Sequence, residues 1–297
     1  MGIVSQEAIV QLQALMDRVD EPLNKTFENV HQGYRAETLA RFLKAREWSV
    51  VKAHKMLMDC LLWRVQNDID HILAKPIVPT ELYRAIRDSQ LIGMSGYSRE
   101  GLPVFAIGVG LSTFDKASVH YYVQSHIQIN EYRDRVILPS ASKKHGRPIT
   151  TCIKVLDMTG LKLSALSQIK LLTIISTIDD LNYPEKTNTY YIVNAPYIFS
   201  ACWKVVKPLL QERTRKKIQV LPGCGRDELL KLYNYIKQQS VINEPAQPIK
   251  QGSFHVDLPE PAAEGTEIVK TLESELHKFE NGNGLPGAID GIKINGD

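Results

Sequence analysis

The sequence predicts an α/β fold in which a mostly parallel sheet with flanking helices follows a small, all-helical N-terminal module. Two observations carry this prediction. Short segments rich in β-branched and aromatic residues alternate with longer apolar segments in the middle of the chain, which is the order of βαβ units. Amphipathic segments with short connections precede them, as in a small antiparallel helical unit. The 297 residues suffice for one large core or two modest ones.

Residues 1–78 are predicted to form the helical module. Apolar residues at helical spacing indicate a first helix over residues 6–19. Proline, asparagine and glycine within residues 22–33 then favour a loop. Two further helices are expected over residues 35–47 and 50–66. The inward face of the first helix is expected to carry Ile9, Leu12, Met16 and Val19.

Residues 79–243 are predicted to form the α/β domain. Pro139 is expected to end one of its helices, because proline has no N–H to donate and restricts the residue before it. Strands separated by helices of this length pair in parallel. The expected strands cover residues 104–109, 151–157, 189–194 and 218–221, and the expected helices cover residues 116–137, 166–181, 198–210 and 226–239.

Charge is divided unevenly along the chain. Residues 251–297 contain nine acidic and three basic residues, so the overall net charge of +3 leaves +9 on residues 1–250. A basic body favours contact with anionic surfaces. We expect residues 244–297 to form an acidic, largely flexible tail. Within it, a short helix is expected to present Ile268, Leu272, Leu276 and Phe279 on one face.

The composition is that of an ordinary globular protein, with 43% hydrophobic and 23% charged residues. No run of about 18 apolar residues occurs, so we expect no membrane-spanning helix. The N-terminus shows no basic region followed by an apolar one, so no signal peptide is expected. Four scattered cysteines without a CxxC pair favour reduced thiols in the cytosol.

The sequence lacks the motifs of the common enzyme classes. It has no GxGxxG after a strand, no P-loop and no GxSxG nucleophile elbow, and its eight histidines form no HExxH pattern. We therefore expect no catalytic residue and no metal site. A basic run at residues 213–217 lacks the interleaved aromatic residues of a nucleic-acid surface, so no nucleic-acid partner is expected.

The segment over residues 198–210 is apolar on nearly every face. A helix of this kind must be buried in protein or lipid, and Pro208 is expected to kink or end it. Spacing alone leaves two interpretations open: a core helix that crosses over between parallel strands, and a functional cover. Its large apolar residues are Phe199, Trp203, Val206, Leu209 and Leu210.

Several motifs in the right order resemble the CRAL-TRIO lipid-binding family, in its secretory-pathway phosphatidylinositol transfer branch. They are the RFLKAR string and the tryptophan after it at residues 41–48, the EGLP turn at residues 100–103 and the YPEK turn at residues 183–186. Under this resemblance, residues 198–210 form the gate of a lipid cavity enclosed by the sheet and its helices. The floor of that cavity is expected to include Val104, Ile153, Val155 and Ile192.

The resemblance also implies a site for the phosphatidylinositol headgroup, formed by Arg46, Glu185, Lys186 and Lys217. Cations suit a phosphate, and a carboxylate suits inositol hydroxyls or orients the cations. The same residues can instead form a structural ion-pair cluster. Lys186 stands where an arginine is more usual, and Cys152 and Lys154 stand where phosphatidylcholine-binding members offer hydroxyls.

The resemblance implies that the protein binds and transfers phosphatidylinositol between membranes without catalysis, with a bound phospholipid as its ligand and no other cofactor. We expect a cytoplasmic monomer that contacts anionic Golgi, endosomal or plasma membranes transiently. Roles in vesicle trafficking and phosphoinositide signalling, with presentation of the lipid to a kinase, are also implied. Two alternatives stay open: a carrier of a sterol, tocopherol or retinoid, and a phosphoinositide-sensing scaffold without transfer activity.

Overall fold

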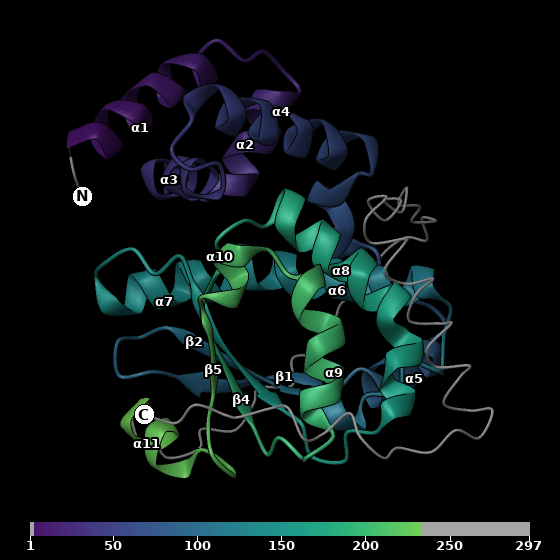
Figure 1. The fold of residues 1–297 in the computed structure, drawn as a ribbon. Helices are drawn as coiled ribbons and strands as arrows, with labels where there is room; N and C mark the ends of the chain where they lie inside the picture. Colours follow the sequence, from purple (N-terminus) through teal and green to yellow (C-terminus); the bar gives the residue numbers. More distant parts are fainter. Residues whose placement is uncertain (1–2, 233–297) are drawn as a thin grey trace. The chain divides into compact units, whose positions relative to one another are not determined.

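Figure 1 shows the chain as a computed structural model, which describes residues 3–232. The chain divides into two compact units, residues 1–259 and 260–297, and every described residue belongs to the first. The acidic tail predicted over residues 244–297, with its apolar stripe, lies outside the described residues. The end of the helix predicted over residues 226–239 lies outside them as well.

Four helices form the N-terminal module and enclose one apolar core. Leu12, Leu39 and Leu57 are fully buried in that core. The first, second and third predicted helices are confirmed as α1, α3 and α4. The module consists of α1 (Ile3–Met16), α2 (Leu23–His31), α3 (Arg35–Ala45) and α4 (Val50–Gln66).

Helix α2 shows that the loop predicted over residues 22–33 is wrong. Pro22 lies just before the helix and Gly33 just after it, which are the positions that these residue types favour. Gly33 has φ of +84°, a conformation that costs glycine little. Between them, the ring of Phe27 is 1% exposed. The proline and glycine therefore mark the two ends of a helix that is held in place by the burial of Phe27.

The α/β domain contains one sheet of five strands in the order β1-β2-β3-β4-β5. Neighbouring strands from β2 to β5 pair in parallel, which confirms the mostly parallel sheet, and β1 pairs antiparallel with β2 at one edge. Strand β1 was not predicted, because its two glycines weaken the strand pattern. The strands are β1 (Ile92–Tyr97), β2 (Pro103–Gly108), β3 (Cys152–Asp157), β4 (Thr187–Val193) and β5 (Ile218–Val220).

Helices and short helical turns connect the strands and link the domain to the N-terminal module (Figure 1). None of the helices in residues 3–232 is long and apolar enough to cross a membrane. The elements are η1 (Ile69–Ala74), α5 (Thr80–Ser89), η2 (Val109–Leu111), α6 (Val119–Tyr132), η3 (Arg133–Ile137), α7 (Leu138–His145), η4 (Leu163–Gln168), α8 (Ile169–Asn182), α9 (Phe199–Val206), η5 (Lys207–Leu209), α10 (Glu212–Arg215) and α11 (Arg226–Leu232).

Pro139 does not end the long helix as predicted. Helix α6 passes directly into η3, a π-helical turn, and η3 passes directly into α7. Pro139 lies in the first turn of α7, where a missing N–H costs little. The wider π turn interrupts the regular hydrogen-bond ladder just before the proline, and π turns of this kind are frequent at functional sites. The π turn therefore changes the direction in which side chains project between α6 and α7.

The two faces of the sheet are packed differently, which corrects part of the predicted cavity floor. Val104, Ile153 and Val155 pack in a core with Leu138 of α7 and Leu229 of α11. Since strand side chains alternate, Lys154 lies on the opposite face from Ile153 and Val155, and it contacts Asp179 of α8. Three of the four predicted floor residues therefore face away from α8. On the α8 side, pairing in register brings Ile107, Leu156, Ile192 and Val220 into one row.

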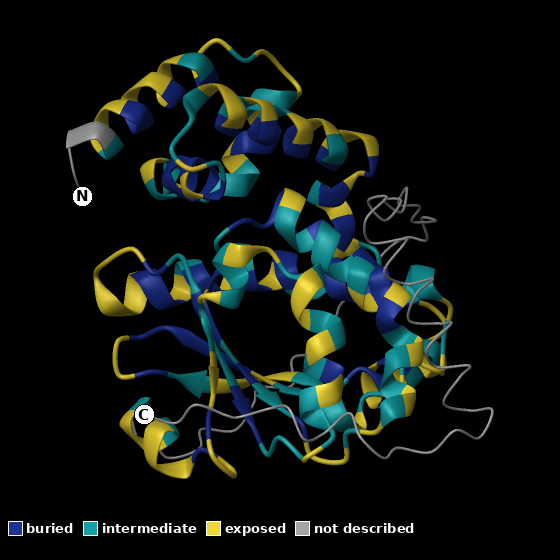
Figure 2. Ribbon diagram, viewed as in Figure 1, coloured by how far each residue is buried: buried dark blue, intermediate teal, exposed yellow. Residues whose placement is uncertain are grey.

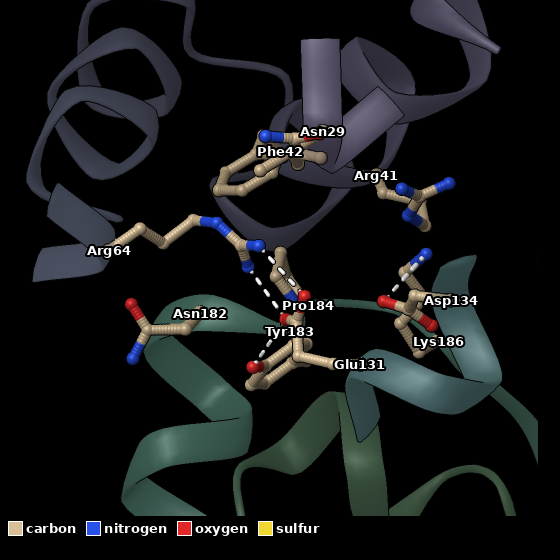
Figure 3. A pocket seen from close by; sticks show the side chains of 11 residues that line it. Asn29, Arg41, Phe42, Arg64, Glu131, Asp134, Asn182, Tyr183, Pro184 and Lys186 are labelled. Carbon is tan, nitrogen blue, oxygen red and sulfur yellow. Dashed lines mark hydrogen bonds and ion pairs between the residues drawn. The ribbon is translucent and has the colours of Figure 1, made fainter. Parts of the chain in front are cut away.

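A buried ion pair joins the N-terminal module to the α/β domain. Arg64 of α4 donates two hydrogen bonds to Glu131 of α6, at 2.7 and 2.8 Å, and also bonds Asp70 at 2.7 Å. The side chains of Arg64 and Glu131 are 3% and 2% exposed. The hydroxyl of Tyr183 donates to the same carboxylate at 2.7 Å (Figure 3). One carboxylate therefore connects the module, α6 and the turn that leads into β4.

We expect Arg64→Met to lower the free energy of unfolding by about 3 to 5 kcal/mol, because it leaves the buried carboxylate of Glu131 without its hydrogen-bonded cation and with only Arg135, at 3.9 Å, as a cationic partner. Urea denaturation measures this loss. Lys55→Met is the matched control: Lys55 pairs with Asp59 on the exposed surface of the same helix, so its replacement should change stability by less than about 1 kcal/mol. Equal losses in the two variants would contradict the structural role of Arg64.

Candidate functional site

A polar pocket lies where α8, the start of β4 and the segment before β5 meet. We call it the Glu185 pocket. Glu185 belongs to the turn between α8 and β4 and has φ of +58°, so the turn requires a left-handed conformation at that residue. The pocket is lined by Arg133, Lys154, Asp179, Asp180, Tyr183, Glu185, Lys186, Thr187, Tyr190, Arg213, Thr214 and Lys217.

Sheet pairing brings the two ends of this pocket together. The N–H of Tyr190 in β4 donates to the carbonyl of Lys217 at 2.9 Å, so Lys217 lies beside the start of β4. Its ammonium group is 2.6 Å from one carboxylate oxygen of Glu185. The guanidinium of Arg213 is 3.3 Å from the other oxygen. Glu185 is therefore held between two cations from the segment that follows the apolar helix.

Arg213 connects the pocket to the N-terminal module. It lies 3.5 Å from Asp180 at the end of α8 and donates to the carbonyl of Ala45 at 2.9 Å. Arg46 donates to that same carbonyl at 2.9 Å. Partial burial, and then the charge of Arg213, lower the pKa of Arg46. Of the predicted site residues, Arg46, Glu185 and Lys217 are thus brought together, with Arg213 between them.

Lys186 also borders the Glu185 pocket, but its ammonium group has a different partner. It lies 3.0 Å from Asp134, and Lys186 as a whole is 8% exposed (Figure 3). Burial, together with the nearby charge of Arg41, lowers the pKa of Lys186 to about 7. The neighbouring residues Glu185 and Lys186 therefore enter two different charge clusters.

The structure adds polar residues that sequence reasoning did not place in the site. Arg213 belongs to the basic run at residues 213–217, so the run was a signal, although it did not say which cation would face Glu185. Asp180 has a pKa raised to about 6, mainly by burial, with Arg213 acting against that shift. Arg133 comes from η3 and had no local signal. Lys154 comes from β3, and the sequence singled it out only as standing where phosphatidylcholine-binding members offer hydroxyls. Among the residues that the structure describes, no group of three or more His, Cys, Asp or Glu side chains is arranged to hold a metal ion.

The apolar helix is shorter and less buried than predicted. It forms α9, and Pro208 lies in the short turn η5 directly after it, which confirms that the helix ends there. Only Cys202 in α9 is buried, and Figure 2 shows most of this helix as half-buried or exposed. The predicted gate residues are all half-buried; they are Phe199, Trp203, Val206, Leu209 and Leu210. The protein therefore does not bury this helix, which contradicts the interpretation as a core helix, and α9 presents apolar surface to solvent.

The sheet face on the α8 side is also incompletely packed. Both faces of a central parallel strand are normally buried. In the central strand β3, Ile153 and Val155 are buried on one face, whereas Leu156 on the α8 side is only half-buried. Its neighbour Ile107 in β2 is half-buried too. Figure 1 shows α9 lying in front of the sheet. Incompletely buried apolar side chains thus occur on α9 as well as on this face of the sheet.

Comparison with known families agrees with the sequence resemblance. The model of the CRAL/TRIO domain matches residues 87–244, and the model of the CRAL/TRIO N-terminal domain matches residues 8–59. The chain belongs to the CRAL-TRIO family.

One of two similar curated relatives carries a phospholipid-transfer name. The chain is 28% identical to a phosphatidylinositol/phosphatidylcholine transfer protein of Arabidopsis thaliana, SFH9, over 77% of this chain and 42% of the relative. It is 29% identical to the SEC14 cytosolic factor of Eremothecium gossypii, over 65% of this chain and 64% of the relative. The chain thus spans less than two thirds of either relative.

A crystal structure of Sfh5 has a similar fold. Its TM-score is 0.58 at 18% sequence identity, and the match covers 91% of this chain and 98% of that chain. This likeness shows that the two chains share a fold.

The buried position of Lys186 should be visible in the pH dependence of stability. Its pKa is about 7 in the folded protein against 10.5 for an ordinary lysine, so the unfolded chain binds more protons between these values. The free energy of unfolding should therefore gain a rising contribution from Lys186 as the pH increases from about 7 to about 10. Lys186→Met should remove that contribution, as measured by urea denaturation at a series of pH values.

The control for this experiment is Lys216→Met, because Lys216 is exposed and pairs only with Glu212, four residues earlier, among the described contacts. Its stability profile should run parallel to that of the unmodified protein. A Lys186→Met profile that is also parallel would show that Lys186 keeps an ordinary pKa.

Proposed function

We propose that this protein binds phosphatidylinositol and transfers it between membranes without catalysing a reaction on it. The observation that carries the proposal is the Glu185 pocket, in which a carboxylate lies between Lys217 and Arg213 beside an apolar, incompletely packed sheet face. Two relatives bear the names of a phosphatidylinositol/phosphatidylcholine transfer protein and the SEC14 cytosolic factor, which supports a phospholipid ligand.

The polar residues suit the two parts of an inositol phosphate headgroup. Lys217, Arg213 and Arg46 can donate to a phosphate, and Glu185 can accept hydrogen bonds from ring hydroxyls. In the arrangement described above, these groups satisfy one another through ion pairs. When a headgroup binds, these ion pairs are therefore replaced by contacts of the same kind between protein and lipid. The free energy lost by breaking the ion pairs is then largely recovered. Lys186 can join them once its ammonium group leaves Asp134.

The acyl chains impose the second requirement. Two chains of a phospholipid contain roughly 30 methylene groups, and exposing them to water would cost on the order of 25 kcal/mol, at about 0.8 kcal/mol each. A carrier must enclose both chains. We propose that they lie between the sheet row that includes Leu156 and Ile192 and the helices α8 and α9, with α9 as the movable cover.

Helix α9 also suits contact with a membrane. Tyr197, just before the helix, is 89% exposed, and tyrosine is favoured where apolar and polar surroundings meet. The +9 charge of residues 1–250 favours anionic membrane surfaces. We therefore propose transient, peripheral contact with anionic cytoplasmic membranes, and presentation of the bound lipid to a lipid kinase as a consequence of opening α9 there.

Lys217→Met should reduce vesicle-to-vesicle transfer of phosphatidylinositol by at least about tenfold, because a charge-assisted hydrogen bond contributes about 1.5 to 3 kcal/mol. Lys216→Met is the matched control, since Lys216 is adjacent in sequence, equally charged and exposed. Transfer at an unchanged rate in Lys217→Met would sink the headgroup assignment. Native mass spectrometry that finds a sterol or retinoid as the bound lipid would favour the other type of carrier.

Phe199→Asp should slow lipid exchange, because it places a charge on apolar surface that must meet hydrocarbon, at a cost of about 2 to 4 kcal/mol. The control is Gln211→Asp, which adds the same charge at an exposed polar position just after the gate. The rate of transfer between vesicles and the amount of lipid retained by the protein are measured together. Equal rates in both variants would mean that α9 does not open.

A further inference from the structure

The inner wall of the Glu185 pocket carries two cations that the proposed headgroup contacts do not use. They are Arg133 of the π turn η3 and Lys154 of the central strand β3. Asp179 and Tyr190 lie with them on this wall. The rim of the pocket, by contrast, is formed by Glu185 with its two partners.

Arg133 is buried with part of its hydrogen-bonding capacity unused. Its side chain is 3% exposed. Nε donates to Asp134 at 2.7 Å and Nη1 donates to Asn130 at 2.8 Å, whereas Nη2 has no hydrogen-bond partner among the described residues. Leaving a buried charged donor unsatisfied costs more than a hydrogen bond ordinarily gains. The missing partner of Nη2 is therefore an acceptor that residues 3–232 do not supply.

Lys154 is also weakly partnered. Its side chain is 12% exposed, and its ammonium group is 3.9 Å from Asp179, beyond hydrogen-bonding distance. The other oxygen of Asp179 accepts from His126 and Asn130, each at 2.7 Å. The ring of Tyr190 lies 5.7 Å from the ammonium group, which is a cation–π contact. Lys154 therefore keeps donors available toward the pocket.

The charge of the pocket indicates what kind of acceptor fits. The lining residues include five basic side chains against three carboxylates, and because the pKa of Lys186 is about 7, the surplus at neutral pH lies between one and two positive charges. Asp134 does not line the pocket but pairs with both Arg133 and Lys186. The positive charge of nearby Arg41 offsets the negative charge of Asp134. A phosphodiester carries one negative charge, whereas a phosphate monoester carries about −1.5 to −2 at neutral pH. The monoester matches this surplus more closely.

We propose that Arg133 and Lys154 form an inner subsite of the Glu185 pocket that binds the phosphate monoester of an anionic phospholipid. This rests on the proposed function, in that the lipid enters between the sheet and α9. Two lipid classes carry such a group: phosphatidic acid, on its glycerol, and a phosphatidylinositol monophosphate, on its ring. A soluble phosphate has the same chemistry and is separated from both by experiment.

The free space in the pocket, about 30 Å³, holds only a few water molecules. A phosphate therefore enters only when the rim opens. The rim contact that has to give way is that of Arg213 with Asp180, which at 3.5 Å is the longest of its charged contacts. Binding at the inner subsite is thereby coupled to displacement of the segment that follows the gate.

The test compares Lys154→Met with Lys170→Met in the full chain. Methionine keeps the length of the lysine stem without its charge, and Lys170 is an exposed lysine on α8. Each protein is incubated with phosphatidylcholine vesicles containing phosphatidylinositol, a phosphatidylinositol monophosphate or phosphatidic acid. The lipid that it extracts is then quantified by mass spectrometry. In parallel, inorganic phosphate is added without vesicles and the unfolding temperature is measured.

We expect the unmodified protein and Lys170→Met to extract at least one of the two monoester lipids. Lys154→Met should extract that lipid at least about tenfold less, as expected for loss of a charge-assisted hydrogen bond. It should still extract phosphatidylinositol at the unmodified level, which shows that it is folded. The lipid that is lost identifies which monoester the subsite prefers.

Three results would overturn the inference. If the unmodified protein takes up phosphatidylinositol but neither monoester lipid, and inorganic phosphate does not stabilise it, the inner subsite does not exist and the proposed function stands. If Lys154→Met extracts the monoester lipids normally, Lys154 is a structural cation. If inorganic phosphate stabilises the unmodified protein but not Lys154→Met, while no monoester lipid is extracted, the source is a soluble phosphate and not a lipid. Extraction of no lipid at all would instead defeat the proposed function.

Discussion

The buried pair of Arg64 and Glu131 is the contact on which the rest of the arrangement depends. It places a helix of the N-terminal module on a helix of the α/β domain, and the same carboxylate holds Tyr183 at the start of the turn into β4. Through that turn it determines where Glu185 lies. A charge pair with so little exposure is stable only when both partners are present and hydrogen-bonded. The position of the Glu185 pocket is thus tied to the packing of two domains.

Side chains alternate between the two faces of β3, so a charged residue and apolar residues lie close together on this strand. One face of β3 buries Ile153 and Val155 in an apolar core, and the other presents Leu156 to an incompletely packed layer. Lys154 lies on this second face at the end nearest the Glu185 pocket. An amphiphile with a charged head and apolar chains would meet matching surfaces in that order. The two requirements of a phospholipid carrier are therefore met by neighbouring positions of one strand.

Local sequence patterns predicted most elements because their causes are local. The spacing of apolar residues was enough for α1, α3 and α4. The predictions failed where a distant contact decided the outcome. Phe27 turned an expected loop into a helix by burying its ring in the module core, and η3 allowed a helix to continue past Pro139. Strand β1 formed despite its glycines because β2 offered an edge to pair with.

The sequence by itself determined the fold class, most of the strands and helices, and the motif residues Arg46, Glu185 and Lys217, because periodicity and motif order are properties of the chain. Only the tertiary structure decided which charges meet. It turned Lys186 toward Asp134, placed Arg213 beside Glu185, and brought Arg133 and Lys154 to one wall. It also left α9 half-buried. Burial and ion pairing depend on which segments pack together. The local sequence around a residue does not specify which distant segment will contact it.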